Sequence, residues 1–93
     1  MKVLFNNAII AQSDKTIMIE TNHYFPPNSV NSDYLKISDK TYTCPWKGVA
    51  IYYDIDVENE IAKNAAWIYK EPKQEAKEIA GYVAFDKAQV DII

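Results

Sequence analysis

The alternation of apolar and polar residues is clearest between residues 49 and 57, where it predicts a half-buried antiparallel strand. Every second residue there is apolar, in the series Val49, Ile51, Tyr53, Ile55 and Val57. The residues between them are Ala50, Tyr52, Asp54 and Asp56. Successive side chains of a strand point to opposite faces, so the first set is expected to face the core and the second set to face outward.

A second alternating stretch predicts one longer strand over residues 16–25. Ile17 and Ile19 then share a face with His23, so His23 is expected to point inward with them. Tyr24 falls on the other face. Pro26 and Pro27 end the strand, because proline has no N–H to donate to a neighbouring strand.

Shorter apolar runs predict further strands over residues 3–5, 8–11, 40–44, 65–69, 82–85 and 90–93. Asn6 and Asn7 predict a tight turn between the first two, because asparagine tolerates positive φ. Residues 28–40 are expected to form a structured loop, with a Ser- or Asn-capped helical turn within residues 29–35 as an option.

Residues 73–80 predict a helix of about two turns that carries Ala76 and Ile79 on one side and stops at Gly81. A chain of 93 residues with many short strands and one short helix is expected to be a single domain over residues 1–93. The predicted fold class is mostly β, as a small antiparallel sandwich or a partly open barrel.

The charge of the chain argues against a nucleic-acid partner. The net charge is −3, and all ten basic residues are lysines. Nucleic-acid binding usually needs a basic surface and often arginine forks, so no nucleic-acid partner is expected. No apolar run approaches the ~20 residues that span a membrane, and none resembles a signal peptide. One cysteine cannot form an internal disulfide, so a cytoplasmic location is expected.

Several motifs together resemble one protein family. They are Asn22-His23-Tyr24-Phe25-Pro26-Pro27, Cys44-Pro45-Trp46-Lys47-Gly48, Tyr52-Tyr53, Ala65-Ala66-Trp67 with Tyr69, and Gly81-Tyr82-Val83-Ala84-Phe85. In this order they resemble the small bacterial domain-of-unknown-function family 427, across nearly the whole chain. The resemblance implies a compact, mostly β domain and no established biochemical activity.

A nucleotidyltransferase label is sometimes attached to that family. Such enzymes need a Gly-Gly or Gly-Ser turn for phosphates and a downstream Asp-x-Asp for magnesium. Asp54 and Asp56 have the Asp-x-Asp spacing, but Gly48 and Gly81 are solitary and no motif supplies a third carboxylate. Alternation alone explains the two aspartates as the outer face of a strand. No metal site and no cofactor are expected.

Three residues are candidates for catalysis: His23, Cys44 and Lys47. His23 could transfer a proton near neutral pH, or it could be a structural imidazole at a strand end. Cys44 would be a nucleophile if His23 or Lys47 favoured its thiolate, or else a small buried hydrophobe. Lys47 could bind an anion, act as an amine nucleophile if desolvated, or rest its stem on Trp46.

Four aromatic residues are candidates for ligand binding: Tyr24, Trp46, Tyr52 and Trp67. They could wall a cavity or simply fill the core, since both uses suit large rings with polar tips. The leading hypothesis is a small-molecule-binding domain with a pocket between the His23 strand end and the turn at residues 44–48. An anionic ligand would lie on Lys47, and whether a reaction follows is open.

Two alternatives remain from the residues alone. The domain could be a non-catalytic protein-interaction or homo-oligomerisation module that uses exposed strand edges and surface aromatics. It could also sense redox state through Cys44, which would require an accessible, acidic thiol.

Overall fold

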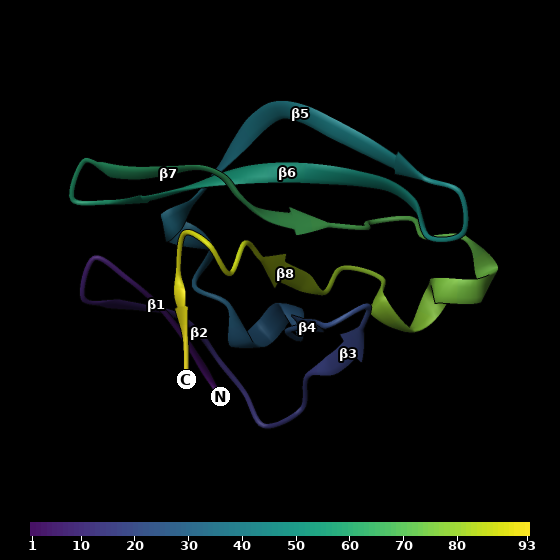
Figure 1. Ribbon diagram of the computed structural model, residues 1–93, viewed down its shortest axis with the longest axis horizontal. Coiled ribbons are helices and arrows are strands. Elements are labelled where there is room, and N and C mark those ends of the chain that lie inside the picture. Colours follow the sequence, from purple (N-terminus) through teal and green to yellow (C-terminus); the bar gives the residue numbers. More distant parts are fainter.

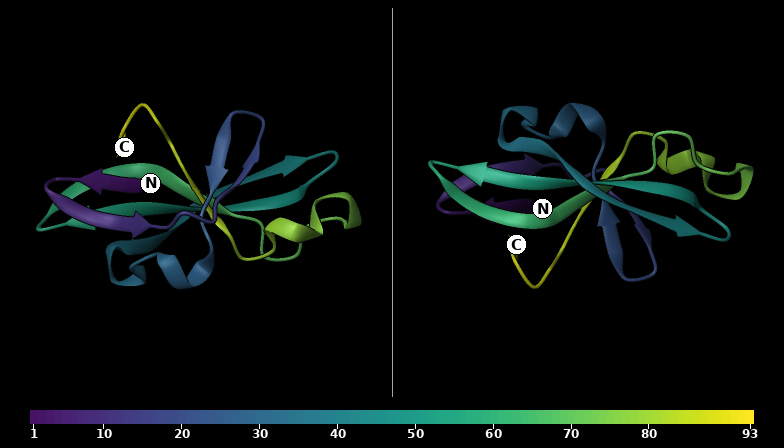
Figure 2. Two further views of the ribbon diagram at one scale, coloured as in Figure 1. Left: turned by 90° about the horizontal axis from the view of Figure 1, so that it is seen from below. Right: turned by 90° about the horizontal axis from the view of Figure 1, so that it is seen from above.

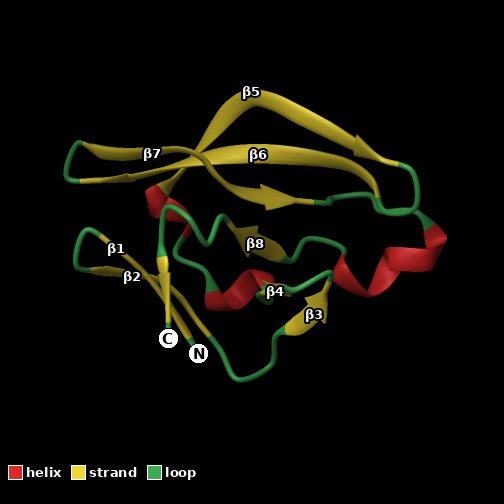
Figure 3. Ribbon diagram, viewed as in Figure 1, coloured by secondary structure: helices red, strands yellow, loops and turns green.

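The computed structural model describes residues 1–93 and consists mainly of antiparallel strands (Figures 1 and 3). The strands are β1 (Lys2–Phe5), β2 (Ala8–Gln12), β3 (Ile17–Ile19), β4 (Asn22–Tyr24), β5 (Leu35–Cys44), β6 (Gly48–Val57), β7 (Glu60–Ile68), β8 (Val83–Phe85) and β9 (Asp91–Ile92). Three short 3₁₀ helices complete the fold: η1 (Pro27–Ser29), η2 (Ser32–Tyr34) and η3 (Gln74–Ile79). None of these helices has the length and apolarity needed to cross a membrane.

The strands form three sheets that pack as a small sandwich. The largest has the order β5-β6-β7-β8, a second has the order β2-β1-β9, and β3 and β4 form a separate hairpin. In Figure 1 the β2-β1-β9 sheet lies below one end of the large sheet, and the hairpin and η3 lie below the other end. The predicted mostly β class is confirmed, and no sheet closes into a barrel.

Three hairpins turn through two residues that both have positive φ. Asn6 and Asn7 form the first, as predicted, and Glu58 and Asn59 form the third. Such turns match the natural twist of paired strands. The second turn, at Glu20 (φ 53°) and Thr21 (φ 68°), was not predicted.

This second turn corrects the prediction of one strand over residues 16–25. The chain reverses at Glu20 and Thr21, so β3 pairs with β4 and Met18 lies opposite His23. Paired residues share a face, so His23 lies on the face of Met18. The expectation that His23 shares a face with Ile17 and Ile19 is therefore wrong.

The face of β6 that is buried changes along the strand. Ile55 and Val57 are buried as predicted, but Val49 is 50% exposed and Ala50 is fully buried. The β2-β1-β9 sheet lies at one end of the large sheet, and the hairpin with η3 lies at the other end (Figure 2). Ile55 and Val57 pack in the cluster at the first end and Ala50 packs in the cluster at the second, so side chains from opposite faces of β6 are buried at its two ends. The single buried face inferred for the whole strand is thus correct only for its second half.

Residues 28–40 contain more regular structure than predicted. The Asn31 side chain accepts a hydrogen bond from the Asp33 N–H (3.1 Å) and caps η2, so the optional helical turn is present. β5 begins at Leu35 rather than at residue 40, and β7 begins at Glu60 rather than at residue 65.

The predicted helix near residues 73–80 is the 3₁₀ helix η3, which is kinked at Ala76. Its buried residues are Ala76 and Ile79, the two residues that were predicted to share one side. Gly81 follows with a φ of 76°, a conformation that glycine adopts without steric cost.

The interior is divided into two clusters. The N-terminal core is entirely apolar, and its buried members are Val3, Ile10, Ala11, Phe25, Ile55, Val57, Ala62, Ala65, Ala66, Val83, Phe85 and Val90. The second, which we call the aromatic cluster, contains Tyr24, Cys44, Ala50, Tyr69, Ala76, Ile79 and Ala84, with Tyr52, Trp67, Tyr82, Ile17 and Ile19 packed against it. The candidate site belongs to the aromatic cluster.

Candidate functional site

The turn between β5 and β6 places Lys47 at the edge of the aromatic cluster. Cys44 pairs with Gly48, and Gly48 has a φ of 112°, which only glycine adopts readily. The segment after β7 packs closely on this turn: a Cβ on Gly48 would lie 3.4 Å from the Lys73 backbone nitrogen. The Lys73 N–H donates to the Lys47 carbonyl (2.9 Å), and the Lys73 Nζ donates to the Pro45 carbonyl (2.7 Å). The segment that follows β7 therefore fixes the conformation of this turn.

Lys47 is the only charged residue that is buried, with 7% of its surface exposed. Its Nζ donates to the Glu20 carboxylate, which reaches it from the β3–β4 turn. The same Nζ lies 5.4 Å from the centre of the Trp46 ring and 5.5 Å from that of Tyr69. Two aromatic faces and one carboxylate thus surround the ammonium, an arrangement that favours the charged form.

The ion pair shifts both of its members toward their charged forms. The hydrogen bond from Lys47 is the main cause that lowers the pKa of Glu20, and the nearby Trp46 indole contributes in the same direction. Burial would lower the pKa of Lys47, but the bond to Glu20 and the neighbouring Tyr24 and Tyr69 outweigh it, so this pKa is raised. Lys47 is therefore an ammonium at neutral pH, which does not suit an amine nucleophile.

Two tyrosines of the cluster, Tyr52 and Tyr69, are held in their neutral form. Burial raises the pKa of Tyr69 to about 12 and also raises the pKa of Tyr52. The Tyr24 hydroxyl accepts a hydrogen bond from the Trp67 indole N–H (3.2 Å), and the Tyr52 and Trp67 rings lie 5.7 Å apart between centres. These side chains can offer O–H donors and flat apolar walls to a ligand.

Cys44 lies in the same cluster and is 6% exposed. Its thiol makes no hydrogen bond to His23 or Lys47. The nucleophile hypothesis requires one of these two contacts, so the structure does not support it. A redox sensor is expected to expose its thiol, and Cys44 does not.

His23 does not join this group. Its Nδ1 and the Thr16 hydroxyl are 2.9 Å apart and share a hydrogen bond. Neighbouring residues of a strand point to opposite faces, so His23 points away from the face on which Tyr24 enters the cluster. The structure thus brings six of the seven predicted site residues to one region, namely Tyr24, Cys44, Trp46, Lys47, Tyr52 and Trp67.

Glu20 was not predicted as a site residue from the sequence. Its carboxylate is the partner of Lys47 only because the chain turns at residues 20–21. Glutamate and threonine are uncommon at positive φ, so the residue types at positions 20 and 21 do not predict a turn.

No hollow opens beside Lys47. The three surface hollows of the structure are lined by other residues, although one lies just outside the turn, at Gly48, Val49, Lys70 and Lys73. The Trp46 and Tyr69 rings and the Glu20 carboxylate are the groups that surround the ammonium. Any anion that binds Lys47 must therefore take the place of the Glu20 carboxylate.

The chain matches one protein-family model. The model described as "Domain of unknown function (DUF427)" matches residues 1–93. The chain belongs to the DUF427 family. A search of curated proteins found no match. The resemblance inferred from the motifs is confirmed, and the shared membership carries no activity with it.

Proposed function

We propose that this DUF427 domain binds a small anionic molecule at Lys47, in the position that the Glu20 carboxylate occupies. The proposal rests on one observation: the only buried charge of the protein is paired with a carboxylate from an exposed hairpin tip. A buried ammonium without a counter-ion is costly, so Lys47 requires an anion at all times. That anion need not be Glu20.

Exchange of Glu20 for a ligand is physically reasonable. The Glu20 side chain is 54% exposed, whereas the Lys47 side chain is 9% exposed. Water and salt weaken the hold on an exposed carboxylate, so the pair should open at its Glu20 side. The ammonium stays where Trp46 and Tyr69 hold it.

The surroundings of Lys47 favour a carboxylate or phosphate attached to a flat ring. Trp46 is 38% exposed and could stack on such a ring from the solvent side. Tyr24 and Tyr69 lie near enough to the ammonium to affect its pKa, so their hydroxyls are candidate donors to such a ligand. The single, buried thiol is compatible with the cytoplasmic location expected from the sequence.

Support for catalysis is weaker. A reaction that uses His23, Cys44 and Lys47 together would need them to converge, and His23 faces elsewhere. We therefore propose binding, without a chemical step.

The interaction-module alternative has a limited basis. β5 is an edge strand of ten residues and exposes Ile37 and Tyr42. However, Lys36, Lys40 and an irregular register protect this edge, as in sheets that avoid pairing with other chains. A monomeric solution mass at high protein concentration would argue against the interaction-module alternative and would favour the binding proposal.

The experiment compares Lys47→Met with a matched lysine variant. Lys36→Met removes an exposed lysine of β5 that makes no ion pair. Thermal-shift and calorimetric titrations with benzoate, phenyl phosphate and larger ring-bearing anions should show binding to the wild type and to Lys36→Met, and no binding to Lys47→Met. Glu20→Gln should bind more tightly, because it removes the competing carboxylate. Binding that persists in Lys47→Met, or an entire panel that fails to bind Glu20→Gln, would refute the proposal.

A further inference from the structure

A second feature of the sheet lies away from Lys47, where β5 and β7 both bulge beside β6. Ile37 pairs with Tyr53 and Thr41 pairs with Ile51, so residues 38–40 lie opposite Tyr52 alone. On the other side of β6, residues 63–65 lie opposite Asp54. Bulges commonly occur where a sheet redirects side chains for function.

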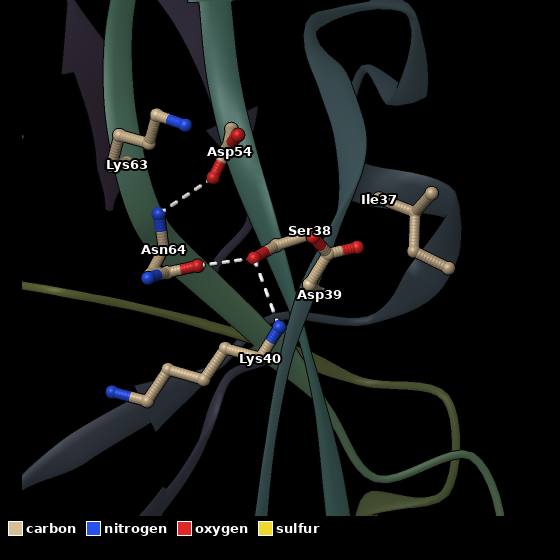
Figure 4. Close-up of a pocket in the computed structure, with 7 residues that line it drawn as sticks. All are labelled: Ile37, Ser38, Asp39, Lys40, Asp54, Lys63 and Asn64. Atoms are coloured by element: carbon tan, nitrogen blue, oxygen red, sulfur yellow. Dashed lines mark hydrogen bonds between the residues drawn. The ribbon is translucent and has the colours of Figure 1, made fainter.

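These two bulges border a hollow of about 450 Å³. Its lining consists of Ile37, Ser38, Asp39, Lys40, Asp54, Lys63 and Asn64, of which only Ile37 is hydrophobic (Figure 4). A hollow with this lining suits a polar ligand rather than an apolar one.

Hydrogen bonds fix the central side chains of the hollow. The Asn64 N–H donates to the Asp54 carboxylate (2.8 Å), and Asn64 has a φ of 53°, in the left-handed region. The Ser38 hydroxyl donates to the Asn64 side-chain carbonyl and accepts from the Lys40 N–H (3.2 Å). One Asp54 oxygen and the Asn64 side-chain NH₂ keep free hydrogen-bonding capacity.

The ionic groups around the hollow do not pair with one another. Asp54 and Lys63 extend from neighbouring strands on the same side of the hollow (Figure 4), yet they form no ion pair, and neither does Asp39. The Lys40 side chain points away, and its Nζ lies 4.6 Å from the centre of the Tyr52 ring. Opposite charges that border one hollow without contact leave room for a ligand with both charges.

We propose that this hollow binds a small zwitterion of the α-amino acid type. The ligand ammonium would donate to the free oxygen of Asp54, with Asp39 as a second acceptor at the rim. The ligand carboxylate would accept from the Lys63 Nζ and the Asn64 NH₂. Charge-assisted hydrogen bonds at both ends would select for a molecule that carries both groups at short separation.

This inference does not rest on the proposed function. The hollow and the Lys47 site share no residue. The two sites can therefore be tested separately, and either can fail alone.

The test is an amide chemical-shift titration of the full chain with three small molecules. Glycine supplies both charges, ethylamine only the cation and acetate only the anion. Glycine should produce saturable shifts at residues 38–40, 54 and 63–64, with a millimolar dissociation constant of the order expected for so small a ligand. Ethylamine and acetate should each bind at least about tenfold more weakly, because each lacks one charge-assisted contact.

Variants make the test specific. Asp54→Asn and Lys63→Met should each weaken glycine binding about tenfold, through loss of one ionic contact. Asp56→Asn, which removes a neighbouring carboxylate of β6 outside the hollow, should leave binding unchanged. Melting curves confirm that each variant is folded. The proposal is overturned if glycine gives no saturable shift, if ethylamine or acetate binds as well as glycine, or if neither Asp54→Asn nor Lys63→Met weakens binding.

Discussion

The N-terminal core and the aromatic cluster differ in chemistry although they lie in one small domain. The N-terminal core buries only aliphatic side chains and two phenylalanines, and the Phe25 and Phe85 rings meet edge to face, 5.7 Å between centres. The aromatic cluster buries two tyrosines and a thiol, and the buried Lys47 ammonium lies at its edge. Apolar packing would have filled the second volume at lower cost, because buried polar groups must all find partners.

If Lys47 binds a ligand as proposed, this difference separates the residues needed for stability from those needed for binding. The N-terminal core contains what a sandwich needs to fold. The aromatic cluster contains what a binding site needs, namely flat walls, hydroxyl donors and a fixed positive charge. Substitutions in the two regions should therefore affect different measurements, from a large change in stability to a small change in pH dependence.

The largest effect is expected in the N-terminal core. Phe85→Ala removes a fully packed ring, so the free energy of unfolding should fall by about 3–5 kcal/mol. Urea unfolding monitored by circular dichroism would measure this. Any ligand of Lys47 should still bind to the fraction that remains folded. A loss below about 1 kcal/mol would show that the two regions do not differ as described.

A smaller loss is expected for Tyr24→Phe in the aromatic cluster. The substitution keeps the ring but leaves the Trp67 indole N–H without its acceptor, which typically costs about 1–3 kcal/mol. Tyr42→Phe is the control, because Tyr42 is exposed and its hydroxyl makes no hydrogen bond within the protein. Equal unfolding free energies for the two variants would argue that the Tyr24 hydroxyl is not structurally engaged.

Lys47→Met should change stability little while it abolishes anion binding. Methionine can fill the volume of the lysine stem, and the exposed Glu20 can return to water. Replacing a buried charge by an apolar side chain is often close to neutral, so we expect a change within about 1 kcal/mol. Chemical denaturation measures it. A loss of several kcal/mol would mean that the ion pair is structural and not a site held ready for a ligand.

The smallest effect concerns the acid side of the stability profile. The pKa of Glu20 is lower in the folded protein, so its contribution to stability is present above pH 4.5 and is lost as the pH falls through the folded pKa. Unfolding free energies measured between pH 7 and pH 3 should therefore fall less steeply for Glu20→Gln than for the wild type. Glu60→Gln is a suitable control, because Glu60 is exposed and forms no ion pair. Identical profiles for wild type and Glu20→Gln would contradict the ion pair in solution.

Sequence patterns predicted the fold better than they predicted the site. Apolar alternation and the Asn6-Asn7 pair identified strands and one hairpin correctly, because those signals are local. The β3–β4 hairpin was missed, because Glu20 and Thr21 adopt positive φ against their usual preference. The change of buried face in β6 was missed too, since it depends on which other sheet covers each end.

For the site too, features that depend on local sequence were predicted and features that depend on tertiary packing were not. Cys44, Trp46 and Lys47 are consecutive or nearly so, and their motif was visible in the chain. The carboxylate that completes the Lys47 site lies 27 residues away, and the proximity of two such segments is set by tertiary packing. His23 was misplaced for the same reason: its face depended on a turn that the pattern did not reveal.

The pairing of β1 with β9 sets the order in which this domain can be completed. The β5-β6-β7 meander joins neighbouring strands through short turns, whereas the Lys2 N–H reaches the Ile93 carbonyl (2.7 Å) across almost the whole chain. Contacts between distant residues form late, because closing a long loop costs entropy before it gains contacts. On a translating ribosome the meander can assemble while the chain is still emerging. β1 can pair with its second neighbour, β9, only after residues 91–92 have left the ribosome. We expect the exposed edge of β1 to be the aggregation-prone feature of the nascent protein.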